Sequence, residues 1–106
     1  MWSQKHGVVG LMRVTAPETA GMGINCNAIH RGWVLTLLSS KSVDAVVLER
    51  KLSTEEAKRA LVGEKMPSNE FVAPEQVSGL AVFLRSAAAD RITDMPLPVD
   101  GCWSAW

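Results

Sequence analysis

His30 and Arg31 are the residues whose types and position first suggest chemistry. They follow one another at the carboxyl end of a predicted strand, 24–30, directly before Gly32. Ligands of open α/β sheets bind at the carboxyl ends of the strands, so an imidazole and a guanidinium there could hold an anion. The alternative is that both are surface residues of a loop, and the sequence leaves the two interpretations open.

Hydrolytic and metal-dependent chemistry find little support. The chain has 2 histidines and several serines, but no spacing resembles a Ser-His-Asp triad. Its 2 cysteines make neither a disulfide framework nor a metal site. Cys26 is expected to be an inert buried thiol. The 106 residues contain no tyrosine and no G-x-G-x-x-G turn for a dinucleotide.

Trp33 and Trp103 are candidates for a binding site of another kind. Each could form the wall of an apolar pocket. The chain has 4 tryptophans among 106 residues, however, and such residues also serve core packing or a subunit interface. Both interpretations stay open from the sequence.

The elements that would position these residues are helices and strands in alternation. Helices are predicted over 3–16, 37–50, 54–62 and 74–86, and strands over 24–30 and 97–100. The first helix should end or kink at Pro17. Residues 53–56, Ser-Thr-Glu-Glu, form a predicted capping box for the helix 54–62, and Gly63 is placed to cap its end.

This order predicts an α/β fold in one domain, 1–106. We expect a partial Rossmann-like fragment with two short parallel strands, a helical crossover and a packed N-terminal helix. Two parallel strands need covered faces and neighbours at both edges, so the fold is expected to be incomplete by itself.

The charges are balanced and interspersed. Eleven basic and 11 acidic residues give a net charge of 0, which argues against nucleic acid or an anionic membrane as a partner. No apolar run reaches the roughly 18 residues that a membrane span needs. The N-terminal residues do not resemble a secretory signal, so a cytoplasmic location is expected.

Three segments resemble the short-chain dehydrogenase/reductase family. Residues 4–11 (QKHGVVGL) resemble the segment that begins with the catalytic Tyr-x-x-x-Lys, and residues 25–36 (NCNAIHRGWVLT) resemble its N-x-I-x-P-G-x-V-x-T. Residues 73–84 and 97–101 resemble its last crossover helix and final strand. Residues 52–59 (LSTEEAKR), 63–65 (GEK) and 101–103 (GCW) are similar to the 3-hydroxybutyrate dehydrogenases of this family. The resemblance covers nearly all of this chain but only about two fifths of a family member.

The resemblance implies a catalytic remnant and a cofactor-facing loop. Lys5 matches the catalytic lysine, but Met1 stands at the tyrosine position, so Lys5 would be vestigial because methionine cannot transfer a proton. Gly32, Val34 and Thr36 match positions that bind the cofactor, which is NAD in the family. No cofactor is expected for this chain alone.

The resemblance also implies a substrate pocket. Trp33 and Trp103 match tryptophans that close it, and Ser40 replaces a carboxylate-binding glutamine with a group too short to reach. Pro17 falls inside a helix that the family leaves uninterrupted, and Asp94 replaces a glycine.

Three functional hypotheses follow, and whether the chain is an enzyme stays open. The first is a truncated dehydrogenase fragment without NAD-dependent turnover of its own. The second is a repurposed ligand- or protein-binding module, expected as a homodimer or homotetramer. The third is a small esterase-like hydrolase that uses newly exposed Ser or His groups.

Overall fold

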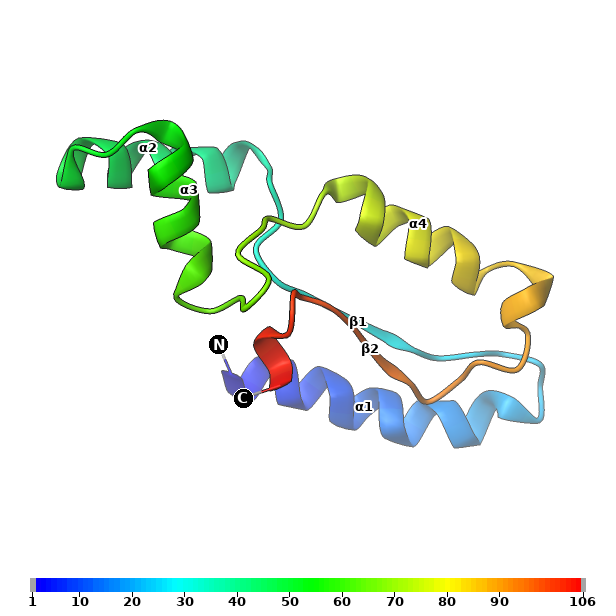
Figure 1. Cartoon of the computed structure of the whole chain (residues 1–106). Helices are drawn as coiled ribbons and strands as arrows, with labels where there is room; N and C mark the ends of the chain where they lie inside the picture. The colour runs from blue at the N-terminus through cyan, green and yellow to red at the C-terminus, as the bar shows by residue number, and fades with distance from the viewer. Residues whose placement is uncertain (1, 106) are drawn as a thin grey trace. The chain divides into compact units, whose positions relative to one another are not determined.

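The computed structural model describes residues 2–105 and divides them into two compact units, 2–30 with 79–97 and 31–78 with 98–105. Two short 3-10 helices, Ala87–Ala89 and Trp103–Ala105, accompany the main elements. The main helices and strands are, in chain order (Figure 1), α1 (Trp2–Ala20), β1 (Ala28–Arg31), α2 (Leu37–Arg50), α3 (Thr54–Gly63), α4 (Pro74–Leu84) and β2 (Pro96–Val99). The predicted α/β class is confirmed, whereas the single domain stays a prediction.

The two strands pair in parallel. The Ala28 N–H donates to the Met95 carbonyl at 3.0 Å, and four residues further along both strands the Gly32 N–H donates to the Val99 carbonyl at 3.0 Å. This equal step in both strands is the pattern of a parallel pair. The predicted pair of parallel strands is therefore confirmed.

The first strand begins later than predicted. Residues 24–27 are not part of β1, and the side chains of Asn25 and Asn27 there bond to the segment that precedes β2. Asn25 Nδ2 donates to the Asp90 carbonyl at 2.9 Å, and Asn27 Nδ2 donates to the Ile92 carbonyl at 2.8 Å. Side-chain amides thus take the place of a regular backbone ladder.

α1 does not end at Pro17, so that part of the prediction is wrong. The helix runs on to Ala20. Pro17 deprives the Arg13 carbonyl of its helical donor, but it lies in the last turn, so few residues depend on that bond. The chain then turns through residues 21–23, where Gly23 has a φ of 72°, a conformation that favours glycine. Met12 and Ala16 form the buried side of α1.

α2 and α3 pack against each other within the second unit (Figure 1). α2 matches its predicted range, 37–50, and α3 extends one residue past its predicted end. At the start of α3 the Ser53 side chain accepts from the Glu56 N–H at 3.2 Å. The prediction that Gly63 caps this helix is wrong, because Gly63 is its last helical residue. A Cβ there would lie 2.9 Å from Asn69 Oδ1, so close approach explains this glycine.

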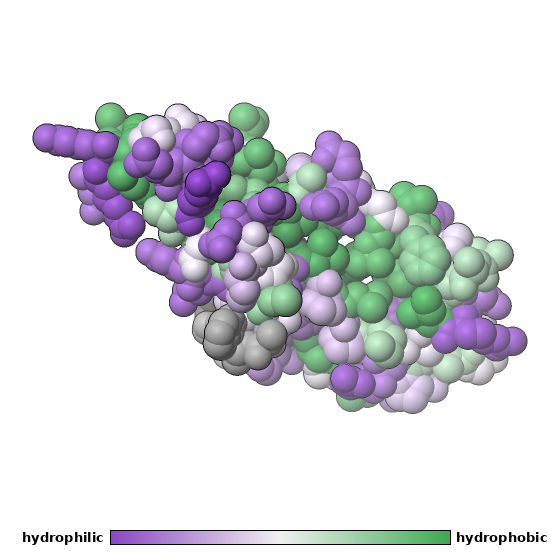
Figure 2. Space-filling view, in the orientation of Figure 1, coloured by the Kyte–Doolittle hydropathy of each residue, from purple (hydrophilic) through white to green (hydrophobic). Residues whose placement is uncertain are grey.

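α4 ends two residues earlier than predicted and carries no fully buried side chain. Figure 2 shows hydrophobic residues gathered over this helix. The core of the second unit lies elsewhere, in a cluster of Val34, Val62, Met66 and Val72. None of the helices in residues 2–105 is long and apolar enough to cross a membrane.

Candidate functional site

The segment that follows β1, residues 32–36, is held from two sides. On one side the Gly32 N–H donates to the Val99 carbonyl of β2. On the other side Val34 forms a parallel bridge with Val72. There the Val72 N–H donates to the Trp33 carbonyl at 2.8 Å, and the Leu35 N–H donates to the Val72 carbonyl at 3.0 Å. Backbone hydrogen bonds therefore fix the conformation of this segment, which contains most of the sequence-predicted site residues.

Gly32 is buried where three groups converge. A Cβ at this position would lie 2.9 Å from the Asp100 Cα and 3.0 Å from both Cε and Sδ of Met66. Contacts this short are essentially never found for a real Cβ, and the nearest atom belongs to the backbone, which cannot easily move. Glycine at this position thus meets a packing requirement of the chain itself.

Trp33 and Trp103 both pack against the apolar cluster of Val34, Val62, Met66 and Val72. The Trp33 ring meets the Phe71 ring edge-on, with centroids 6.5 Å apart and planes at 70°. The Trp33 N–H donates to the Met66 Sδ at 3.2 Å. The structure therefore brings the two tryptophans to one cluster, where each is half-buried.

Thr36 begins α2 as its N-cap. Its side chain accepts from the Ser39 N–H at 3.4 Å, and its own N–H donates to Ser39 Oγ at 2.7 Å. This is a reciprocal capping box that the sequence analysis missed, although the Thr-x-x-Ser spacing could have suggested it. Ser40 is half-buried in the first turn, where its N–H donates to the Thr36 carbonyl at 2.9 Å.

Lys5 belongs to a different unit from these residues. It lies on the surface of α1, in the first unit, whereas residues 32–40 and Trp103 belong to the second. Met1, which matches the tyrosine position, lies outside the described residues. His30 is half-buried in β1, and the exposed Arg31 donates from Nη1 to the Gly32 carbonyl at 3.4 Å. Among residues 2–105 no cluster of His, Cys, Asp and Glu could hold a metal ion.

Asp100, which is not among the residues predicted to form a site, organises the turn after β2. The predicted strand 97–100 includes it, but β2 ends at Val99 because the buried carboxylate of Asp100 accepts two backbone donors of the turn. Oδ1 accepts from the Cys102 N–H at 3.1 Å and Oδ2 from the Ser104 N–H at 2.9 Å. Gly101 and Cys102 have φ of 56° and 73°. The Asp-Gly pair is a turn signal that could have revealed this arrangement.

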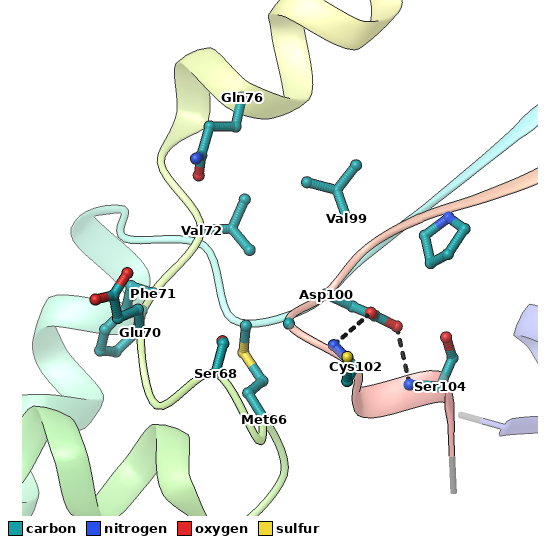
Figure 3. A pocket seen from close by; sticks show the side chains of 12 residues that line it. Met66, Ser68, Glu70, Phe71, Val72, Gln76, Val99, Asp100, Cys102 and Ser104 are labelled. Atoms are coloured by element: carbon teal, nitrogen blue, oxygen red, sulfur yellow. Dashed lines mark hydrogen bonds between the residues drawn. The ribbon is translucent and has the colours of Figure 1, made fainter.

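An open cleft of about 580 Å³ lies between this turn and residues 66–76 (Figure 3). Met66, Val72 and Val99 supply apolar surface, while Ser68, Glu70, Gln76, Asp100 and Ser104 supply polar groups. Its lining includes two carboxylates and no cationic side chain. The cleft is therefore poorly suited to hold the carboxylate of a hydroxy acid, which needs a positive or hydrogen-bond-donating partner.

Two comparisons of the sequence point to one family. A family model described as enoyl-(acyl carrier protein) reductase matches residues 1–104. The chain is 48% identical over 101 residues to the D-beta-hydroxybutyrate dehydrogenase of Cupriavidus necator, which covers 95% of this chain and 39% of that protein. It is 34% identical, with the same coverage, to the protein of that name from Rhizobium meliloti. The chain thus spans about two fifths of the length of these relatives.

Solved structures agree with this result. An actinorhodin polyketide ketoreductase structure with NADPH superposes with a TM-score of 0.80 at 30% identity, covering 98% of this chain and 40% of that one. A short-chain dehydrogenase family protein from Francisella tularensis gives 0.82 at 24% identity, with coverage of 96% and 42%, and shows the fold alone. Because the fold, the family model and the sequence relatives agree, the chain belongs to the short-chain dehydrogenase/reductase family and is similar to part of a 3-hydroxybutyrate dehydrogenase.

Proposed function

We propose that this chain is a 3-hydroxybutyrate dehydrogenase-type portion of a short-chain dehydrogenase and has no NAD-dependent turnover by itself. The observation that carries the proposal is the 48% identity to a D-beta-hydroxybutyrate dehydrogenase in a chain without any tyrosine. The family resemblance implies a tyrosine as general acid and base for hydride transfer, and the methionine at the matching position cannot transfer a proton.

The residues present do not fit a complete dinucleotide. The space beside Gly32 is filled by the Asp100 backbone and the Met66 side chain, so that glycine is not open to a ligand on that side. The Thr36 hydroxyl is already engaged as the N-cap of α2. The chain contains no glycine-rich turn to bind a pyrophosphate. We therefore infer that residues 32–36 could line only one end of a cofactor.

A steady-state assay tests this proposal. The purified chain is incubated with NAD and D-3-hydroxybutyrate, and NADH is followed by absorbance, with the full-length Cupriavidus necator enzyme as the positive control. We expect no NADH above the rate without protein. NADH production that scales with the chain's concentration and falls in Lys5→Ala would contradict the proposal, since that variant separates the chain's own activity from a contaminant's.

We further propose that the chain self-associates through α1 as a homodimer or homotetramer. Val8, Leu11 and Val14 are 62%, 68% and 57% exposed, although all three are large and apolar. Gly7 and Gly10 lie on the same side of the helix, and nothing lies within 4 Å of a Cβ built on either. Exposed apolar side chains beside glycines allow another helix to approach closely.

Light scattering at micromolar concentration tests the association. We expect a dimer or tetramer, and a shift toward monomer in the double variant Leu11→Glu, Val14→Glu. Leu48→Glu is the matched control, because Leu48 is 81% exposed but lies on α2. A monomer at every concentration, or an equal response of the control, would contradict the proposal. Ester hydrolysis stays a prediction from the sequence, since no observation singles it out.

A further inference from the structure

A second cleft, distinct from the one beside Asp100, lies between α3 and the loop of residues 68–71. Its volume is about 600 Å³, which is in the range of small-molecule sites. Leu35 and Phe71 supply its apolar surface, and Ser68 and Asn69 supply a hydroxyl and an amide. Its charged lining residues are Glu55, Lys58, Arg59 and Glu70. Apart from Ser68, Glu70 and Phe71, these residues do not line the first cleft.

The loop side of this cleft is held in place by the rest of the second unit. The Ser68 N–H donates to the Gly101 carbonyl at 3.2 Å, and the Asn69 N–H donates to the Met66 carbonyl at 2.9 Å. The Phe71 ring packs edge-on against Trp33. The backbone of Leu35 is bonded to Val72. The wall is therefore preorganised, which lowers the conformational cost of binding a ligand.

The charges of the cleft divide into one ion pair and two exposed groups that have no ion-pair partner in the described part of the chain. Lys58 Nζ lies 3.7 Å from Glu55 Oε1, so these two neutralise each other along one face of α3. Within residues 2–105, the Arg59 guanidinium and the Glu70 carboxylate have neither an ion-pair partner nor a side-chain hydrogen bond. One cation and one anion thus line the same cleft without pairing with each other.

We propose that this cleft binds a small zwitterion with an apolar body, such as an aliphatic amino acid. Its carboxylate would pair with the planar donor fork of Arg59, and its ammonium would pair with Glu70. Its hydrocarbon part would cover Leu35 and Phe71. A ligand with only a negative charge is attracted by Arg59 but repelled by Glu70. A ligand with only a positive charge is attracted by Glu70 but repelled by Arg59. Only a ligand with both charges satisfies both groups.

Three probes with four-carbon bodies test the proposal on the unmodified chain: 4-aminobutyrate, butyrate and n-butylammonium. Binding is measured by titration of backbone amide chemical shifts at pH 7 and constant ionic strength. We expect 4-aminobutyrate to bind roughly threefold to fivefold more tightly than either singly charged probe, the effect of one exposed ion pair. The shifts should gather at Leu35, Arg59, Glu70 and Phe71. Equal or tighter binding of butyrate or n-butylammonium would overturn the proposal.

Two variants, each of which removes one charge from the cleft, test which residue contacts which end of the ligand. Arg59→Gln should weaken 4-aminobutyrate and butyrate by roughly threefold to fivefold and leave n-butylammonium unweakened, and Glu70→Gln should show the reverse selectivity. Lys65→Gln, a change of charge in the same unit outside the cleft, should alter none of them. A uniform loss for all three probes in both variants, with circular dichroism unchanged, would overturn the assignment. Arg59→Lys keeps the charge but not the donor fork, so it should keep more affinity than Arg59→Gln and less than the unmodified chain.

Discussion

Gly32 and Asp100 approach each other so closely that a single methyl group would not fit between them. A Cβ at Gly32 would lie 2.9 Å from the Asp100 Cα, in the region where the chain leaves both paired strands. The glycine that the family resemblance predicts to face a cofactor is therefore a packing residue of this chain.

Gly32→Ala is expected to lower the free energy of unfolding by about 1–3 kcal/mol, because the added methyl overpacks a site bounded by backbone. Denaturant unfolding followed by tryptophan fluorescence measures the change. Gly79→Ala is the matched control: Gly79 lies at an exposed position of α4, and nothing lies within 4 Å of a Cβ built there. The control should stabilise the chain by about 0.5–1 kcal/mol. Changes of the same sign in both variants would contradict the packing explanation.

Met66→Ala should be among the most destabilising changes in the second unit. Met66 is fully buried in the apolar cluster, and its sulfur accepts the Trp33 N–H at 3.2 Å. We expect a loss of about 2–5 kcal/mol in the free energy of unfolding, from lost burial and the cavity left behind. Met66→Leu keeps the volume and should cost less than about 1.5 kcal/mol. Met22→Ala, at an exposed position, should have little effect; a comparable loss there would argue against the cavity.

Asp100→Ala should destabilise the turn after β2. It removes both acceptors of the Cys102 and Ser104 N–H groups, at a cost of about 1–3 kcal/mol for donors left without partners. Asp100→Asn retains one oxygen and should lose less. Hydrogen exchange of the two amides reports the effect directly. Asp90→Ala, at an exposed position, serves as the control, and unchanged protection of the Cys102 and Ser104 amides in Asp100→Ala would contradict the prediction.

Asp94→Gly is expected to stabilise the chain. Asp94 has a φ of 61°, and its Oδ1 is buried without a hydrogen-bond partner among the described residues. The ion pair of Oδ2 with Arg13 Nη1, at 3.0 Å, is half exposed and contributes little. Relief of the left-handed backbone should raise the free energy of unfolding by about 0.5–1 kcal/mol.

Thermal unfolding of Asp94→Gly can be compared with that of Lys51→Gly, which changes another non-glycine residue in the left-handed region, at φ 52°. Lys51 is the C-cap of α2, where glycine is favoured, so this variant should stabilise by a similar amount. A clear loss of stability in Asp94→Gly alone would show that the Arg13 ion pair outweighs the strain.

The elements governed by neighbouring residues could be predicted well. The range of α2 was correct, and Ser53 caps α3 as expected, because each depends on groups three or four residues apart. β1 was placed too early, since the bonds of Asn25 and Asn27 reach residues 89–95, which local patterning does not contain. The helix past Pro17 was missed because the penalty for proline depends on how many residues follow it.

The same distinction between local and long-range features applies to the candidate site. The family, the α/β class and the absence of tyrosine can be read from residue types and their order. Which residues match cofactor and substrate positions stays a prediction of the family resemblance. The folded chain is needed to see that Gly32 meets Asp100 and that Trp33 and Trp103 share one cluster. The same holds for Arg59 and Glu70, which line one cleft. Gly32 and Asp100, like Trp33 and Trp103, are far apart in the chain, so their meeting depends on how the backbone folds as a whole.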